Sequence, residues 1–350
     1  GAPFHCTSLK VAGPAGQCPA PAAASSLRSS LDRPLPSVTW DKLGSVRPIP
    51  DAVRHHVDLI LGLAEVDEPA VRKAKLRVVL DAVHGAGGAI GRELLERLGC
   101  DVTVMFEEPT GRFPREPEPV AEHLGALATE VKRQGADLGM AFDPDVDRLS
   151  LVDETGTAIG EECTLALAAD HVLDVKAGPV VTNLSTSARL EAVAARPGQQ
   201  AFRTPVGEAN VVHGIKEAGA RVGGEGNGGV ILPALHLGRD APCGVALVLS
   251  GLARRGQSLS AWAGSLPPAV MLKTQHPLQG EPAFEKAEEA LSKSFSINTF
   301  DRRDGLRATG PEGWVHLRKS GTEPIIRIIA EAADAAKAQA LVDAAARALS

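Results

Sequence analysis

The pattern of apolar and polar residues divides the chain into a first segment without periodicity and a long stretch of alternating strands and helices. Residues 1–50 are rich in Pro, Ala, Gly and Ser and show no sustained period of 3.6 or 2, so we expect a loop or a frayed remnant there. From Asp51 to Gly62 apolar residues recur at helical spacing. The stretch LRVVLDAVHGAGGAIGRELLERLGCDVTVMF then reads as strand, glycine turn, helix and strand, which is one α/β unit.

Similar units follow along the chain. A helical pattern in EPVAEHLGALATEVKRQG leads into the apolar strand ADLGMAF, and GPVVTNLSTSARLEAVAA again reads as strand, turn and helix. The last part combines the helix FEKAEEALSKSF, the strands GWVHL and IIRIIAEA, and a final helix. The pattern predicts the α/β class, with tandem mixed-sheet α/β domains over residues 51–175 and 176–273 and a smaller α+β domain over residues 277–350.

Length, composition and charge narrow the function classes. A chain of 350 residues exceeds the usual size of one domain, and 44% hydrophobic with 23% charged residues is ordinary for a soluble protein. The formal charge of −6 gives no general attraction for nucleic acid. No stretch of about 18 apolar residues and no signal-peptide plan occurs, so we expect a cytoplasmic protein without a membrane or nucleic-acid partner. The residues do not predict an oligomeric state.

The run DPDVDRLSLVDE, residues 143–154, points to a cation. Asp143, Asp145 and Asp147 stand at alternate positions directly after an apolar strand, where α/β proteins bind ligands. A calcium loop of the EF-hand kind would also want Glu154 at its twelfth position, but it needs glycine where Arg148 stands. The other interpretation is a magnesium site that serves a phosphate ester, and the spacing alone leaves a metal site and a plain loop about equally supported.

Glycines and polar residues mark three further places. The glycines of AVHGAGGAIG lack the spacing G-x-G-x-x-G, so a tight strand-to-helix turn is favoured over a dinucleotide site. Glu225 and Asn227 lie among glycines that let a ligand or another backbone approach closely. The turn RKSGTEP, with Arg327 after it, offers backbone N–H groups, hydroxyls and guanidinium groups that suit a phosphate dianion, although a solvated hairpin turn remains the alternative. Together with the aspartate run, these features indicate a sugar phosphate held between domains.

These loops carry a family resemblance that covers the chain from about residue 51 onward. The runs DPDVDRLSLVDETG, GGEGNGGVILPALHLGRD and RKSGTEPIIRI resemble, in order and spacing, the metal, sugar and phosphate loops of the α-D-phosphohexomutases. The sequences of these motifs are most similar to those of phosphoglucosamine mutases and of the related phosphomannomutase/phosphoglucomutase branch.

The resemblance implies a role for each matching residue. The magnesium ion, Mg²⁺, would be held by Asp143, Asp145 and Asp147, and the catalytic residues would be Lys10 and Arg148. The sugar hydroxyls would contact Glu225 and Asn227. The residues that would bind the phosphate are Arg318, Ser320, Gly321, Thr322 and Arg327.

The chain departs from the family pattern at three positions. Many relatives have serine in place of Asn227 and histidine in place of Gly229, which leaves substrate choice open. His236 or Arg239 could supply the missing donor, although a surface or structural role is the expectation for each. Pro144 replaces the usual glycine, which narrows φ there and could distort the metal loop.

The family reaction moves a phosphoryl group between the C6 and C1 oxygens of a hexose through a phosphoserine and a bisphosphorylated sugar. The resemblance to phosphoglucosamine mutases implies that the hexose here is glucosamine phosphate. The family's T-A-S-H-N-P-type serine loop is matched by no stretch of these 350 residues, and Ser8 lies in the wrong context. We therefore expect that most of the first domain is missing, with residues 1–50 as its remnant, and that the chain as given binds hexose phosphates without mutase activity. A phosphomannomutase/phosphoglucomutase and a non-catalytic sugar-phosphate-binding protein are the alternatives.

Overall fold

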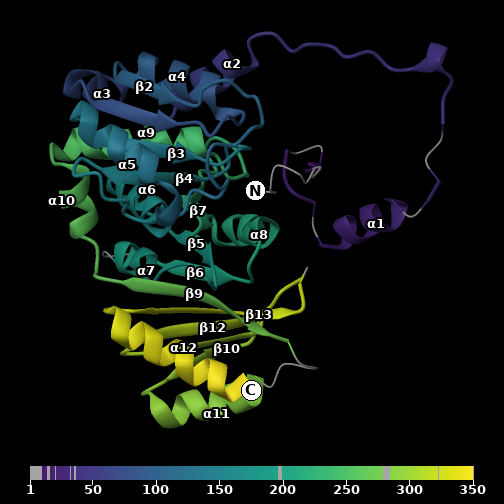
Figure 1. Cartoon of the computed structure of the whole chain (residues 1–350), viewed down its shortest axis with the longest axis vertical. Coiled ribbons are helices and arrows are strands. Elements are labelled where there is room, and N and C mark those ends of the chain that lie inside the picture. Colours follow the sequence, from purple (N-terminus) through teal and green to yellow (C-terminus); the bar gives the residue numbers. More distant parts are fainter. Residues whose placement is uncertain are drawn as a thin grey trace.

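The computed structural model describes residues 10–13, 16–19, 21–31, 33–34, 37–195, 199–278, 284–321 and 323–349. Three β-sheets follow one another along the longest axis of the molecule, with the first sheet at the top of Figure 1 and the C-terminal sheet at the bottom. None of the described helices combines the length and the apolarity that crossing a bilayer requires.

The expectation of a loop over residues 1–50 is wrong in one part. The segment contains helix α1, Pro21–Leu31, and the short 3-10 helix η1, Trp40–Lys42. Side chains 23–31 are all exposed, and α1 stands to the side of the sheets in Figure 1. Side chains 23–31 form no buried apolar stripe, so this part of the sequence carries no helical period. Alanine, leucine and arginine in it favour helix formation by their own propensity.

The first sheet has the strand order β2-β1-β3-β4, in which β1, β2 and β3 are parallel and β4 is antiparallel to β3. Its strands are β1 Arg77–Asp81, β2 Asp101–Met105, β3 Leu138–Phe142 and β4 Leu149–Asp153. The helices of this part are α2 Ala52–Leu61, α3 Glu68–Ala74, α4 Gly87–Arg97, η2 Ala121–His123 and α5 Gly125–Gln134. The predicted unit of strand, glycine turn, helix and strand is thus confirmed as β1, α4 and β2.

The glycine turn between β1 and α4 is a packing feature, as its spacing predicted. A Cβ atom at Gly85 would lie 2.6 Å from the Cα and carbonyl oxygen of Pro144, and one at Gly87 would lie 2.5 Å from the ring of Phe142. The amide of Ala86 also donates to the Pro144 carbonyl at 2.9 Å. The glycine turn therefore packs directly against the backbone of the aspartate run. Only glycine lets the two backbone segments approach so closely.

The second sheet repeats the topology of the first. Its order is β6-β5-β7-β8, with β5, β6 and β7 parallel and β8 antiparallel to β7. Its strands are β5 Val180–Asn183, β6 Ala201–Thr204, β7 Val222–Glu225 and β8 Gly229–Ile231. The helices of this part are α6 Glu161–Val175, α7 Arg189–Ala194, α8 Glu208–Ala218, α9 Ala241–Arg255 and α10 Leu259–Gly264. The turns β3–β4 and β7–β8 consequently occupy equivalent places in the two repeats.

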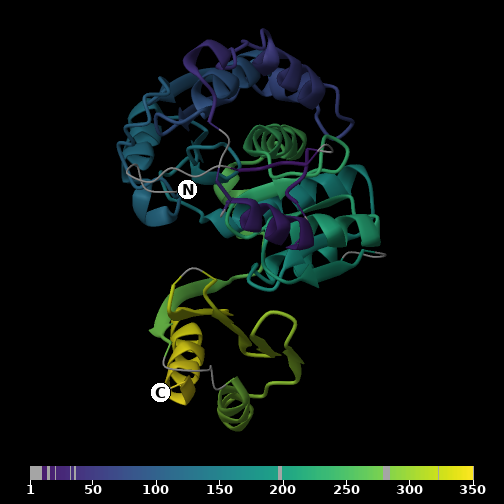
Figure 2. The same ribbon diagram turned by 90° about the vertical axis from the view of Figure 1, so that its right-hand side faces the viewer.

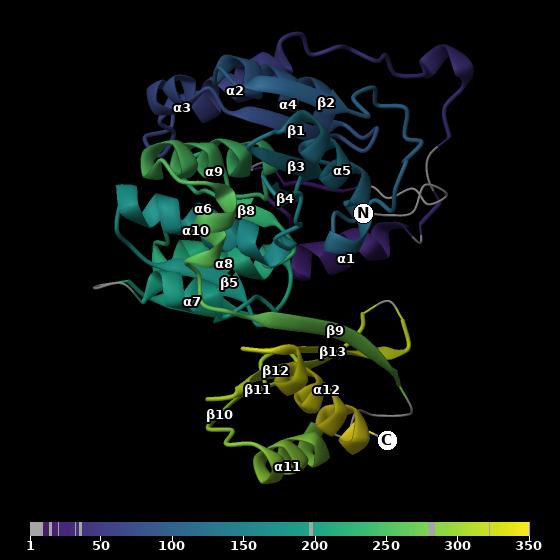
Figure 3. The same ribbon diagram turned by 60° about the vertical axis from the view of Figure 1, so that its left-hand side comes forward.

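Helices α6 and α9 join the first two sheets into one hydrophobic core. Both helices are buried over most of their length, and they lie between strands of the two sheets in Figure 3. Phe142 from β3, Leu165 from α6, Val222 from β7 and Leu247 from α9 belong to the same cluster of buried side chains. This shared core fixes the β3–β4 and β7–β8 turns relative to each other.

The C-terminal sheet is antiparallel and has a core of its own. Its order is β10-β11-β12-β13-β9, with β9 Val270–Pro277, β10 Thr299–Asp301, β11 Leu306–Gly310, β12 Gly313–Lys319 and β13 Ile325–Ala332. Helices α11 Phe284–Ser294 and α12 Ala335–Leu349 pack on it, and Figure 2 shows this part below the other two. Because β9 pairs with β13 along its whole length, we propose that this domain begins at Val270 and not at residue 277.

Candidate active site

The aspartate run forms the turn between β3 and β4. Asp143 is fully buried, and its Oδ1 atom accepts the backbone N–H groups of Asp147 at 3.0 Å and Arg148 at 3.1 Å. Val146 adopts a left-handed φ of 63°, which is unusual for a β-branched residue and turns the loop sharply. As a result, oxygen atoms of Asp143, Asp145 and Asp147 come within 4.8 Å of one another despite the proline at position 144.

The charges of this turn suit a small divalent cation. Burial and the neighbouring carboxylates of Asp147 and Asp145 raise the pKa of Asp143 to about 8. Asp143 Oδ2 and Asp147 Oδ1 are buried and have no hydrogen-bond partner among the described residues. Buried carboxylate oxygens without a hydrogen bond are costly, and an oxygen-only donor set is the kind that magnesium prefers. The residues present therefore fit a magnesium ion.

Lys10 reaches this turn from the N-terminal segment. Its Nζ atom forms ion pairs with Asp145 and with Asp147 Oδ2, the latter at 2.6 Å. Although burial opposes the change, the hydrogen bonds to Asp145 and Asp147 raise the pKa of Lys10. The structure thus places Lys10 beside the aspartates across 137 positions of sequence.

The calcium alternative does not agree with the fold. Leu149–Asp153 is strand β4, and the carboxylate of Glu154 accepts hydrogen bonds from the backbone N–H and hydroxyl of Ser260 at the start of α10. The twelfth residue of the run therefore serves a helix N-terminus and not the aspartates.

The sugar loop lies in the equivalent β7–β8 turn and touches the aspartate turn directly. The Leu149 N–H donates to the Gly228 carbonyl at 3.0 Å, and Gly228 has a φ of 89° that favours glycine. Glu225 Oε1 accepts from the Asn183 side chain at 2.8 Å and from the Gly207 N–H at 3.1 Å. Asn227 Oδ1 accepts a hydrogen bond from the N–H of Gly229, which lies in the same turn.

Arg239 connects the metal and sugar loops. Its guanidinium group contacts Asp147 at 2.7 Å, Glu208 at 2.9 Å and Glu225 at 3.1 Å, and only 10% of the side chain is exposed. A Cβ atom at Gly229 would collide with the Arg239 side chain, so this arginine occupies the space that a larger residue at position 229 would need. Arg239 consequently has a structural role inside the site. His236 instead bonds to Asp240 at 2.8 Å.

The phosphate turn joins β12 to β13. Arg318 donates to Asp304 at 2.7 Å, and Asp304 also accepts the Val206 N–H at 2.9 Å from the second sheet. Ser320 is buried, Gly321 is exposed, and Arg327 is half-exposed. Thr322 lies outside the described residues, as does Ser8.

One cavity of about 290 Å³ collects residues from all three parts. Of the residues expected from the sequence, it is lined by Arg148, Glu225, Asn227, Arg318 and Arg327. Sequence reasoning missed Glu118, Glu161, Glu162, Asn183, Ser185 and Lys273, which also line it. The aspartates lie beside it, since Arg148 follows Asp147 directly and its Nε lies 3.6 Å from the Asp147 carboxylate.

The residues that were missed form ion pairs in the cavity wall. Arg148 pairs with Glu118, and Lys273 pairs with Glu161 at 2.6 Å and Glu162 at 3.1 Å. Burial raises the pKa of Glu162 to about 7. Glu118 lies in the loop before η2, Glu161 and Glu162 begin α6, and Lys273 belongs to β9, so no local spacing in the sequence predicts this group.

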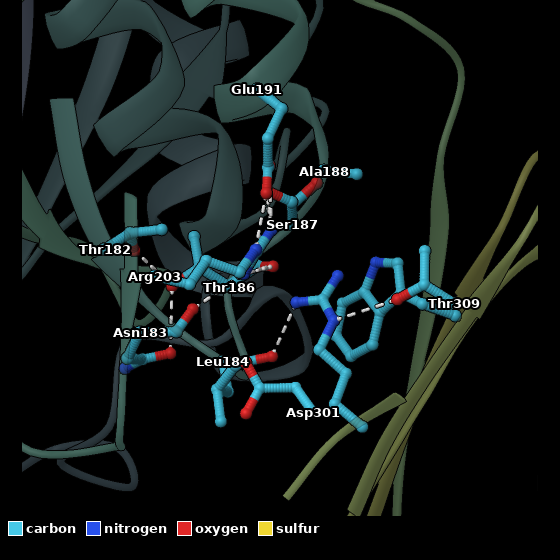
Figure 4. Close-up of polar contacts among 12 residues, drawn as sticks. Thr182, Asn183, Leu184, Thr186, Ser187, Ala188, Glu191, Arg203, Asp301 and Thr309 are labelled. Atoms are coloured by element: carbon cyan, nitrogen blue, oxygen red, sulfur yellow. Dashed lines mark hydrogen bonds and ion pairs between the residues drawn. The ribbon is translucent and has the colours of Figure 1, made fainter. Parts of the chain in front are cut away.

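Buried polar contacts fix the C-terminal sheet against the second sheet. Arg203 holds the loop after β5, with hydrogen bonds to the carbonyls of Asn183 and Thr186 (Figure 4). Arg307 on β11 donates to the Leu184 carbonyl at 2.8 Å and stacks 4.1 Å from the ring centroid of Trp314. The Arg307 contact holds the C-terminal sheet, and with it the phosphate turn, against the second sheet.

Family models match most of the chain. They are the phosphoglucomutase/phosphomannomutase alpha/beta/alpha domain II over residues 54–156, alpha/beta/alpha domain III over residues 161–270 and C-terminal domain over residues 277–348. A phosphoglucomutase/phosphomannomutase of Thermococcus kodakarensis is 38% identical over 305 residues, which cover 86% of this chain and 66% of that protein. A protein of Methanopyrus kandleri named probable phosphoglucosamine mutase is 35% identical over 317 residues, which cover 89% of this chain and 69% of that protein. The chain thus spans about two thirds of the length of these relatives.

Solved structures agree in fold. A phosphoglucomutase/phosphomannomutase family protein of Burkholderia thailandensis superposes with a TM-score of 0.72 at 27% identity, covering 85% of this chain and 64% of that chain. An N-acetylphosphoglucosamine mutase of Aspergillus fumigatus, solved with GlcNAc-6P and magnesium, superposes with a TM-score of 0.57 at 18% identity, covering 85% of this chain and 68% of that chain.

Proposed function

Because the chain belongs to the phosphoglucomutase/phosphomannomutase family, we propose that its cavity binds a hexose phosphate as part of a phosphohexomutase. The observation that carries this proposal is the joining of Arg148, Glu225 and Arg318 in one cavity, because they come from three different sheets. Each of the three loops expected from the sequence contributes to that cavity.

The phosphate of the ligand would lie at the C-terminal end of the cavity. Arg318 and Arg327 can offer planar, bidentate hydrogen bonds to phosphate oxygens, and the exposed Gly321 adds a backbone N–H group. The sugar hydroxyls would face Glu225 and Asn227, whose side chains both accept hydrogen bonds and line the same cavity. This orientation directs the far end of the sugar toward Arg148 and the aspartate turn.

We propose that Asp143, Asp145 and Asp147 hold magnesium. The bound ion would offset negative charge on the phosphoryl group during its transfer. Lys10 and Arg148 flank the aspartates and can stabilise phosphoryl oxygens with their own charge. Arg239 keeps Asp147 and Glu225 in fixed positions through its two ion pairs.

The chemical step needs a group that gives and receives the phosphoryl group. In the family a phosphoserine donates it to a sugar hydroxyl, whose proton leaves, and the resulting bisphosphate returns its other phosphoryl group to the serine. These 350 residues contain no stretch that matches the family's serine loop. We therefore propose that they supply the ligand and metal sites, and that turnover requires a family-type first domain.

Two substrate classes compete for the cavity. Glucosamine phosphate is our first choice, because Glu161 and Glu162 in the cavity wall can face the ammonium group at C2. Glucose and mannose phosphates are the second choice, since the Thermococcus kodakarensis relative carries both names.

The test joins a family-type first domain to the N-terminus and measures the conversion of glucosamine 6-phosphate to the 1-phosphate with magnesium and glucose 1,6-bisphosphate. We expect turnover in the joined protein, its loss in the Asp147→Asn variant of that protein, and negligible turnover by the 350 residues alone. Parallel assays with glucose and mannose 6-phosphates rank the substrates by kcat/KM. Robust turnover by the 350 residues alone, with a phosphorylated residue among positions 1–50 in mass spectra, would contradict the proposal.

A further inference from the structure

A second cluster of ligating side chains lies outside the hexose phosphate cavity. His56 projects from α2, His236 belongs to the loop after β8, and Asp240 is the N-cap residue of α9. The Nε2 atoms of His56 and His236 lie 2.7 Å and 2.8 Å from the same Oδ2 atom of Asp240. None of the three lines the hexose phosphate cavity.

The donor atoms of this cluster are nearly placed for a metal ion. The two imidazole nitrogens and the carboxylate oxygen lie within 4.8 Å of one another. Tetrahedral zinc with bonds of about 2.0–2.1 Å separates its donors by about 3.3 Å, so each imidazole nitrogen needs to move away from the Asp240 oxygen by only about half an ångström. The ion would take the place of the two imidazole protons that now point at Asp240.

A backbone hydrogen bond also orients the carboxylate of Asp240. Asp240 Oδ1 accepts the Cys243 N–H at 2.6 Å, and this bond fixes the orientation of Oδ2, the oxygen that faces the two histidines. Such outer contacts of a ligand commonly tune metal affinity. The guanidinium group of Arg239, next in sequence, is engaged with Asp147, Glu208 and Glu225 and so does not occupy the place of the ion.

Solvent reaches the cluster directly. The side chains of His56 and His236 are 28% and 39% exposed, and His56 and Asp240 line an open cavity of about 410 Å³. Asp145 lines the same cavity, so the cluster and the aspartate turn open to a common solvent space. Their chemistry differs, because imidazole groups select zinc, cobalt, nickel or copper, whereas carboxylates alone suit magnesium.

We infer that His56, His236 and Asp240 form a second cation site, which takes a transition metal ion of the zinc type and is distinct from the magnesium site. A bound ion would tie α2 of the first sheet to the loop that carries Arg239. Occupancy of the site would then stabilise the arginine contacts that join the metal and sugar loops.

The probe is Co²⁺ alone, titrated into the full chain without a histidine tag, in the presence of excess Mg²⁺. We expect one ion per chain with the visible absorption of cobalt bound to nitrogen ligands, and a rise in Tm when Zn²⁺ replaces it. His236→Asn should weaken binding at least about tenfold, as loss of a ligand costs no less than loss of an outer contact. The matched control is His55→Gln, which changes the exposed neighbour of His56 on the same helix and should leave binding unchanged.

Two results would overturn the inference. The first is the absence of the cobalt spectrum in the unaltered chain, which needs no variant and so does not depend on the folding of one. The second is binding that persists in His236→Asn and His56→Gln but is lost in Asp145→Asn, because the ion would then occupy the aspartate turn only.

Discussion

Binding of magnesium should release a proton from Asp143. The pKa of this buried carboxyl is raised to about 8, whereas a metal ligand must be ionised. At pH 7 about 0.9 proton would leave for each ion bound, and the apparent affinity would fall about 90-fold, or about 2.7 kcal/mol, from pH 9 to pH 6. Without the ion, the free energy of unfolding should fall as pH rises from about 4 to about 8, because the folded chain holds a proton that the unfolded chain releases.

Titration calorimetry in two buffers of different ionisation enthalpy counts these protons directly. The control is Asp145→Asn, which removes one of the charges that raise the pKa of Asp143. In this variant we expect weaker binding, with the pH dependence shifted to lower pH. No proton release at pH 7, together with an affinity that is constant from pH 6 to pH 9, would refute the reasoning.

Three further predictions concern the surroundings of the site. Gly85→Ala places a Cβ atom 2.6 Å from the backbone of Pro144. The substitution should therefore lower the unfolding free energy by about 1–3 kcal/mol and weaken magnesium binding. An unchanged magnesium affinity would contradict this. Glu162→Gln should bind glucosamine 6-phosphate more weakly than the unaltered chain at pH 8 but about equally at pH 6, because Glu162, with its pKa raised to about 7, offers a negative charge to the ammonium group at C2 only at the higher pH. A constant ratio of the two affinities in calorimetry would argue against it. Arg307→Met removes the hydrogen bond to the Leu184 carbonyl and should lower the unfolding free energy by about 1–3 kcal/mol in denaturant titrations, whereas equal stability would show that the contact is dispensable.

Among the helices, those with a one-sided burial pattern are the easiest to predict from the sequence. Helix α2 buries Val57 and Ile60 on one face and ends before Gly62, so its period and its cap were both visible. Helix α6 is buried on nearly every side between two sheets, whereas α1 is exposed along residues 23–31. Neither pattern contains a period of 3.6, because that period arises only where one face meets water and the other meets the core.

The site was predictable as loops but not as an assembled cavity. The aspartate run and the phosphate turn were recognisable because their residue types suit one ligand chemistry at short spacing. Arg239 and Lys273 act over long sequence separations, and their contacts with Asp147 and Glu161 follow from the shared core and from the pairing of β9 with β13. Tertiary structure alone brings such partners together.

The central claim is that the cavity recognises a phosphorylated sugar through its C-terminal arginine residues, and calorimetry with glucosamine 6-phosphate and glucosamine tests it most directly. The account predicts that Arg318→Gln weakens binding of the phosphate ester by about 1.5–3 kcal/mol, which is about 10- to 150-fold. Arg302→Gln, which alters an exposed arginine of the same domain, should change nothing. Unphosphorylated glucosamine should bind little and be indifferent to both changes. Equal binding of the sugar with and without its phosphate would contradict the account.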